Sequence, residues 1–172
     1  MTKYGLINEE PVIRTRSGKW INVFYPKIED ICIEDIAHAL SMQCRFGGHL
    51  PVFYSVAQHS VMCSLMVPEE YALEALLHDA SEAYLLDMPS PIKHGLTNYK
   101  DVETALQKVI AAKFGIPLIM SDIVKAADNQ CLLMEWNGMM ISSGPYLEVE
   151  NHYWSMMRFM QRFNELTNEK AD

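Results

Sequence analysis

Apolar residues recur along most of the chain at the three- and four-residue spacing of amphipathic helices. Proline and glycine interrupt this pattern, and neither residue readily continues a helix. The segment from Gly138 to Pro145 predicts a loop before the last helix. The pattern as a whole predicts helices over 33–43, 53–66, 69–86, 99–114, about 122–136 and about 150–167.

Residues 11–25 follow a different pattern, because apolar and polar positions alternate there around Ser17-Gly18. This alternation predicts a short β-hairpin. The sequence contains no internal repeat, and its 172 residues fit one domain. We therefore expect an all-α helical bundle over residues 1–172, with a small N-terminal β-hairpin at 11–25 and a helical core at about 33–167.

The net charge is −8, from 14 Lys and Arg against 22 Asp and Glu. This balance disfavours a basic groove for duplex nucleic acid and binding to an anionic membrane surface. No apolar run reaches the length of about 18 residues that suggests a membrane span, and the N-terminus does not resemble a signal peptide. A soluble, cytoplasmic protein is expected. Its four cysteines form no Cys-x-x-Cys pair, which favours reduced core thiols.

The third predicted helix, 69–86, is apolar on nearly all sides but contains His78, Asp79 and Glu82. Burying such groups without partners costs several kcal/mol or more. A divalent cation would satisfy them, because imidazole and carboxylate are common metal ligands. A capped or salt-bridged trio at a helix surface is the alternative.

Two further helices carry candidate ligands, His59 in 53–66 and Asp128 in about 122–136. Alone, His59 fits a hydrogen-bonded core histidine and Asp128 fits an exposed aspartate. Together with His78 and Asp79 they place His, His-Asp and Asp on three separate helices. These four residues are therefore candidates for one ligand set.

This order of ligands resembles the HD superfamily of metal-dependent phosphohydrolases. The block His78-Asp79-Ala80-Ser81-Glu82, followed by Asp87-Met88-Pro89-Ser90-Pro91-Ile92-Lys93, is similar to bacterial HD-type 5′-deoxynucleotidases, as is Arg45-Phe46 before the first ligand. The resemblance covers roughly residues 45–130. The hairpin and the segments 35–41 and 47–49 depart from it, which indicates a divergent branch of the phage or prophage kind.

The resemblance implies a fold and a set of residue roles. The fold is an HD-domain helical bundle, with one divalent ion (Mn, Co, Zn, Fe or Mg) bound by His59, His78, Asp79 and Asp128. Glu82 either orients the attacking water or protonates the leaving 5′ oxygen. Asp87 either supports the ligands or contacts the sugar. The expected substrate contacts are Arg45 with phosphate, Phe46 with the sugar or base, His49 at the pocket mouth, and Lys93, which is either a phosphate contact or a solvated turn lysine.

The expected activity is release of phosphate from small-molecule nucleotides, deoxyribonucleoside 5′-monophosphates above all. One alternative is a dNTP triphosphohydrolase, although Arg45 and Lys93 provide few cations for a polyphosphate. Another is a nucleotide-binding or protein-interaction module that has lost turnover. The aromatic residues Tyr153, Trp154 and Phe159 fit either a core or a subunit interface. The sequence therefore leaves open whether the protein forms a homo-oligomer.

Overall fold

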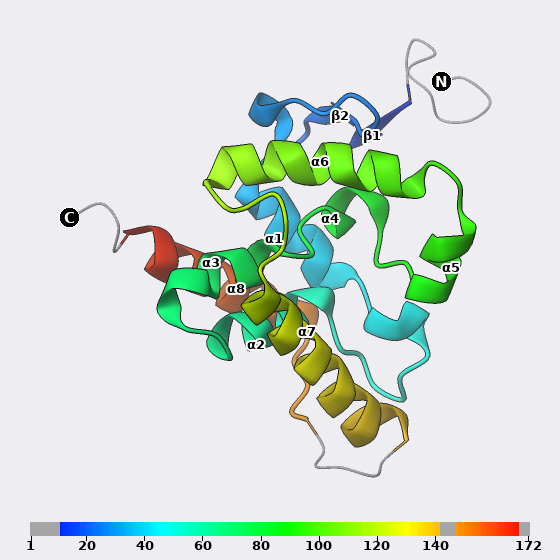
Figure 1. Ribbon diagram of the computed structural model, residues 1–172, viewed down its shortest axis with the longest axis vertical. Coiled ribbons are helices and arrows are strands. Elements are labelled where there is room, and N and C mark those ends of the chain that lie inside the picture. Colours follow the sequence, from blue (N-terminus) through cyan, green and yellow to red (C-terminus); the bar gives the residue numbers. More distant parts are fainter. Residues whose placement is uncertain (1–10, 142–146, 169–172) are drawn as a thin grey trace.

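The computed structural model describes residues 11–141 and 147–168, and helices dominate this part of the chain (Figure 1). The four predicted helices 33–43, 99–114, 122–136 and 150–167 all form, with ends within two residues of expectation. The predicted class, all-α with a small N-terminal β-hairpin, is confirmed. The elements are β1 (Val12–Arg14), β2 (Trp20–Asn22), α1 (Ile33–Met42), α2 (Val56–Leu65), α3 (Glu69–Leu77), α4 (Glu82–Leu85), α5 (Ser90–Gly95), α6 (Tyr99–Phe114), α7 (Asp122–Glu135) and α8 (His152–Asn168).

The hairpin is antiparallel, with Ile13 opposite Ile21, and Ile21 is fully buried. Its turn is fixed to α1 by the buried carboxylate of Asp35. This carboxylate accepts hydrogen bonds from the backbone N–H of Ser17 (2.7 Å) and from the Ser17 hydroxyl (2.6 Å). The hairpin and the first helix are therefore joined by polar contacts as well as by packing.

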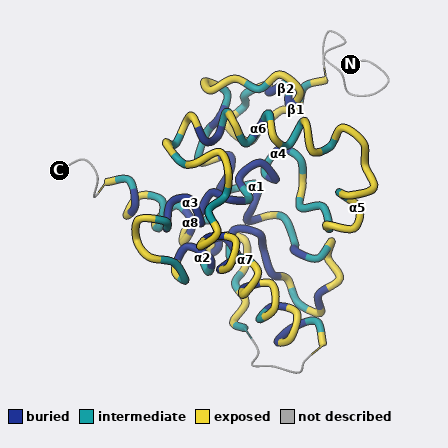
Figure 2. Tube along the Cα trace, in the orientation of Figure 1, coloured by how far each residue is buried: buried dark blue, intermediate teal, exposed yellow. Residues whose placement is uncertain are grey.

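The largest hydrophobic cluster includes buried residues of α1, α2, α3, α6 and α8, among them Leu40, Ala57, Leu76, Ile110 and Phe159. Helix α2 packs against α1, α3, α7 and α8. Figure 2 shows α2 and α3 as largely buried segments and α5 as exposed. Because α2 and α3 are central, the polar residues on them lie inside the molecule. Among the described residues, no helix is both long and apolar enough to cross a membrane.

The predicted single helix over 69–86 is wrong, because α3 ends at Leu77 and α4 begins at Glu82. The imidazole of His78 donates through Nδ1 to the carbonyl oxygen of Ala75 (2.7 Å), which in a continuous helix would accept from the N–H of Asp79. The next bonds span three residues, as in Glu82 N–H to Asp79 O (2.9 Å). His78 and Asp79 therefore lie just past the end of α3, between the two helices.

Three other predictions need correction. The second helix begins at Val56 and not at 53, because Ser55 caps it by accepting a hydrogen bond from the N–H of Gln58 (3.1 Å). The proline-rich segment after Asp87 contains α5, whose Pro91 lies in the first turn, where proline is tolerated. The predicted loop 138–145 overlaps a π-helical turn at Trp136–Met140, and its residues 142–145 lie outside the described ranges.

Candidate metal centre

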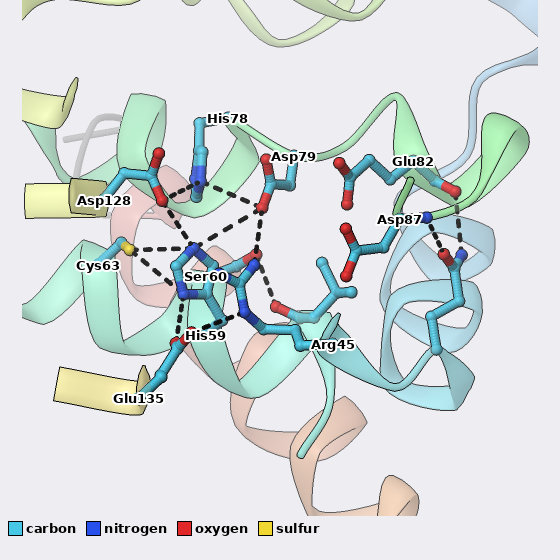
Figure 3. Close-up of polar contacts among 12 residues, drawn as sticks. Arg45, His59, Ser60, Cys63, His78, Asp79, Glu82, Asp87, Asp128 and Glu135 are labelled. Atoms are coloured by element: carbon cyan, nitrogen blue, oxygen red, sulfur yellow. Dashed lines mark hydrogen bonds and ion pairs between the residues drawn. The ribbon is translucent and has the colours of Figure 1, made fainter. Parts of the chain in front are cut away.

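The four predicted ligands, His59, His78, Asp79 and Asp128, lie together at the junction of α2, the end of α3 and α7 (Figure 3). The Nε2 atom of His59 lies 3.2 Å from Asp128 Oδ1 and 3.7 Å from Asp79 Oδ2. The Nε2 atom of His78 lies 3.2 Å from Asp79 Oδ2 and 3.8 Å from Asp128 Oδ1. The structure thus brings all four residues to one place.

These separations match the spacing between ligands of one metal ion. Ligand atoms about 2.1 Å from a tetrahedral ion lie about 3.4 Å from one another, and octahedral neighbours lie about 3.0 Å apart. The four measured separations, from 3.2 to 3.8 Å, are of this size. Two nitrogen and two oxygen donors suit zinc, manganese, iron or cobalt.

Both imidazoles are oriented for metal binding by hydrogen bonds on their far sides. The Nδ1 atom of His59 lies 2.6 Å from Glu135 Oε1, and Nδ1 of His78 lies 2.7 Å from the Ala75 carbonyl oxygen. When Nδ1 carries the proton, Nε2 presents its lone pair to the centre. The Nε2 atom of His78 is buried, and the polar atoms beside it are carboxylate oxygens of Asp79 and Asp128. A cation is the ligand that such an atom fits.

A fifth donor, Cys63, lies close to this group. The donor atoms of His59, Cys63, His78 and Asp128 all lie within 4.8 Å of one another, and such a group can hold a metal ion. However, Cys63 Sγ is 3.5 Å from His59 Nε2 and 4.0 Å from its Nδ1. These similar distances place the sulfur over the side of the imidazole ring rather than beyond Nε2, where a bound ion would lie. Asp79 is not a member of this group, although its Oδ2 lies 3.2 Å from His78 Nε2.

The pKa values of the histidines and aspartates in the centre are shifted by their contacts with one another. Burial disfavours charge on Asp128, but hydrogen bonds with His59 and His78 hold its pKa well below its usual range. Burial lowers the pKa of His78, but Asp79 and Asp128 raise it well above its usual value. Both shifts follow from the pairing of the imidazoles with the carboxylates, which favours the charged form of each. A divalent ion would take the place of that pairing.

Arg45 enters the centre from the turn after α1, and it has a partner that the sequence did not indicate. Its predicted contact with phosphate stays a prediction. Its Nε donates to Glu135 Oε2 (2.8 Å), and its Nη1 lies 3.8 Å from Asp79 Oδ2. Glu135 is fully buried and bridges Arg45 to His59. Arg45 is thus part of the support for the ligands, and its remaining N–H groups lie on the side of Asp79.

Phe46 and His49 are placed less centrally than expected. Phe46 adopts a left-handed backbone conformation (φ 56°), and its ring centroid lies 6.1 Å from that of Trp136. The Arg45 guanidinium carbon lies 5.7 Å from the same ring, within the range of a cation–π contact. His49 is exposed. Their predicted contacts with substrate stay predictions.

Glu82 and Asp87 point toward the side of the centre on which Asp79 lies (Figure 3). Glu82 is buried, and its Oε1 accepts from Lys93 Nζ (3.0 Å) while Oε2 has no partner in the described structure. Burial and the charges of Asp79 and Asp87 raise the pKa of Glu82 to about 9. Lys93 also donates to Glu103 (2.9 Å), so it is not a freely solvated turn lysine.

A pocket of about 590 Å³ opens beside His78, Asp79 and Glu82. The apolar part of its lining consists of residues 116–120, which connect α6 to α7. The charged side chains on its lining are Glu74, Asp79, Glu82, Glu103, Lys93 and Lys100. The volume lies within the usual range for small-molecule sites. Arg45, Phe46, His49 and Asp87 are not among its lining residues.

Sequence reasoning missed two residues that hold the predicted ones in place. Glu135 lies seven residues after Asp128, two helical turns along the same face of α7, and this spacing was the available signal. Gln43, just past α1, contacts both Glu82 and Asp87 through its amide. Nothing in the sequence around Gln43 indicates these contacts.

Comparison with known proteins gives relatives but no described activity. No family model matches the chain. The chain is 45% identical over 173 residues to the uncharacterized protein YfdR of Escherichia coli K12, in an alignment that covers 90% of this chain and 95% of that protein. The chain belongs to the YfdR family. The uncharacterized protein RCAP_rcc00048 of Rhodobacter capsulatus is also similar, at 34% identity over 136 residues, which cover 71% of this chain and 69% of that protein.

The alignment with YfdR extends over nearly the whole of both chains, so YfdR is similar in length as well as in sequence. Neither relative's name states an activity. For this member of the YfdR family, a functional assignment therefore depends on the geometry of the centre formed by α2, α3 and α7, and the centre is consistent with an HD-like fold.

Proposed function

We propose that this protein is a metal-dependent phosphohydrolase of the HD type that releases phosphate from nucleoside 5′-monophosphates, with deoxyribonucleotides as the preferred substrates. The observation that carries the proposal is the pair of imidazoles whose Nδ1 atoms are both engaged, by Glu135 and by Ala75 O, so that both Nε2 atoms face Asp79 and Asp128. Two buried imidazole nitrogens that face two carboxylates are a donor arrangement that a divalent ion fits.

Different residues of the centre have different roles in the proposed reaction. When bound, a divalent ion lowers the pKa of water and polarises a phosphate oxygen. His59, His78, Asp79 and Asp128 hold that ion. Glu82 handles a proton: its unpartnered Oε2 and raised pKa suit a group that either orients the attacking water or protonates the leaving 5′ oxygen. The charge of a cation beside Asp79 would lower the pKa of Glu82 toward neutrality.

The charges in the pocket favour a monophosphate over a triphosphate. Four carboxylates line it, Glu74, Asp79, Glu82 and Glu103, against Lys93 and Lys100. Lys93 is already paired with two of these carboxylates. A polyphosphate extending into this space would meet excess negative charge, whereas an uncharged sugar and base would fit against the apolar part of the lining at 116–120. We therefore assign the pocket to the nucleoside part of the substrate.

A substrate panel tests the proposal. The metal-stripped protein is incubated with nucleoside mono-, di- and triphosphates while Mn²⁺, Co²⁺, Mg²⁺ or Zn²⁺ is added back, and inorganic phosphate and polyphosphate are measured separately. The expected result is phosphate from monophosphates, faster from dAMP than from AMP. Release of triphosphate from dNTPs would support the triphosphohydrolase instead. No product from any substrate would support a binding module.

A further inference from the structure

Gln43 lies at the C-terminal end of α1 and connects three parts of the candidate site. Its backbone carbonyl oxygen accepts from the N–H of Val56 (3.1 Å), the first residue of the helix that carries His59. Its side-chain Nε2 donates to the carbonyl oxygen of Glu82 (2.9 Å), and its Oε1 accepts from the N–H of Asp87 (2.8 Å). One residue therefore contacts α2 and both ends of the segment Glu82–Asp87.

The segment that the Gln43 amide holds is strained. Leu86 has φ 73° and ψ 152°, a conformation that is rare for any residue except glycine. The Leu86 side chain is 65% exposed, so its own packing does not hold it there. Its N–H donates to Glu82 O (2.8 Å), the same oxygen that accepts from Gln43. Tyr99 Oη also donates to Leu86 O (3.4 Å), and the hydrogen bonds of Gln43 hold the chain on either side of Leu86.

This conformation decides where two carboxylates point. Figure 3 shows the carboxylates of Glu82 and Asp87 on the side of the centre on which Asp79 lies. The Gln43 amide contacts the backbone of these two residues, at Glu82 O and Asp87 N–H, and leaves their carboxylates free of its own hydrogen bonds. If Leu86 relaxed to negative φ, the chain direction between Glu82 and Asp87 would change. The distances from these carboxylates to the bound substrate would change with it.

We propose that Gln43 is a positioning residue for turnover, which sets the placement of Glu82 and Asp87 relative to the ion held by His59. The proposal rests on the proposed function, because it gives Glu82 and Asp87 a task in the reaction. It requires that the loss of the Gln43 amide lower kcat while the affinity for the ion stays unchanged. None of the four metal ligands depends on this amide.

The test compares Gln43→Leu with Gln58→Leu, because the chain offers a matched control. Gln58 holds a different segment in the same way: Nε2 donates to Glu148 O (2.7 Å) and Oε1 accepts from Glu150 N–H (3.1 Å). Each variant loses two side-chain bonds to the backbone. In Gln43→Leu we expect kcat for dAMP to fall by about 10- to 100-fold, the effect of a misplacement of about 1 Å. KM and the affinity for Mn²⁺ should stay near parental values, and kcat of Gln58→Leu should equal the parent's.

A second substitution separates positioning from a general loss of stability. Glycine adopts φ 73° without strain, so Leu86→Gly added to Gln43→Leu should recover part of the lost kcat. An unchanged kcat in Gln43→Leu, or an equal fall in Gln58→Leu, would overturn the role of Gln43 while the proposed function stands. If kcat does not recover in the double variant, the role of Gln43 is overturned as well. A parent protein that hydrolyses no nucleotide in the panel would overturn the proposed function and this role together.

Discussion

The Nδ1 atom of His59 lies 2.6 Å from Oε1 of Glu135, and both side chains are fully buried. The other oxygen of Glu135 is bonded to Arg45, so one carboxylate orients a metal ligand and neutralises a buried cation. In Glu135→Gln the amide can serve only one of these partners well. We expect affinity for Mn²⁺ to fall by about 10- to 100-fold, as for other supports of metal-bound histidines. Isothermal titration calorimetry measures it.

Glu135→Gln is preferable to Glu135→Ala, because removing one partner of a buried ion pair costs about 3–5 kcal/mol and can unfold the protein. Glu148→Gln, in the described segment before α8, serves as a control that leaves Mn²⁺ affinity unchanged. Parental affinity in Glu135→Gln would mean that the bond to Glu135 does not orient His59 for metal binding.

Asp128 lies between the two imidazoles, with Oδ1 3.2 Å from His59 Nε2 and 3.8 Å from His78 Nε2. Asp128→Ala should lose the ion and activity together, because three ligands and a less negative centre remain. Circular dichroism should show nearly native helical content. The control is Asp122→Ala, an exposed aspartate on the same helix, which should keep both. A metal-binding Asp128→Ala variant would exclude Asp128 as a ligand.

Metal binding should strengthen as the pH rises. Burial and Arg45 lower the pKa of His59, but hydrogen bonds to Asp128 and Glu135 raise it above 6.5 overall, and the pKa of His78 is also raised. Protons therefore compete with the ion for both Nε2 atoms. In the metal-free protein the raised pKa values stabilise the fold fully below the unfolded value of about 6.5, and this stabilisation is lost as the pH rises through the folded values.

The increase in Tm caused by Mn²⁺ should consequently grow between about pH 6 and about pH 9. Differential scanning fluorimetry with and without Mn²⁺ across this range measures it. His152→Ala, at an exposed position at the start of α8, should show the same trend as the parent. A Mn²⁺-induced increase in Tm that is independent of pH would show that the imidazole protons do not compete with the ion.

Glu82 should be required for turnover but not for metal binding. Glu82→Gln keeps the shape and removes the titratable carboxyl group, so kcat should fall by about 10²- to 10⁴-fold with Mn²⁺ affinity retained. Glu103→Gln is the matched control, since it removes the other carboxylate bonded to Lys93, and its kcat should change far less. Loss of the ion in Glu82→Gln would make Glu82 a ligand. Unchanged kcat would assign proton handling to Asp87 or to the ion alone.

The strongest local signal came from His78 and Asp79, because they interrupt a segment that is apolar on nearly all sides, and a buried polar group needs a partner. His59 and Asp128 were candidates only in combination with them. Their convergence followed from the order of helices in the resemblance. The break in the helix at His78 was not predictable from periodicity, because it depends on a side chain taking the Ala75 carbonyl oxygen.

The contacts that hold the candidate site residues in place could not be predicted from the sequence, for a different reason. Gln43 and Glu82 are 39 residues apart, and His59 and Glu135 are 76 apart. Neither pair has a local pattern, since both depend on how whole helices pack. The left-handed conformations of Phe46 and Leu86 are also imposed by tertiary contacts, against the preferences of these residues.

The most direct test of the account is a titration of metal-stripped protein with Mn²⁺ while phosphate release from dAMP is followed. Four ligands around one centre predict that the rate rises from near zero and saturates at one ion per chain. Asp128→Ala should stay inactive throughout the titration, and Asp122→Ala should follow the parent. Full activity without the ion, or no phosphate release at saturating Mn²⁺, would contradict the assignment of a metal-dependent phosphohydrolase.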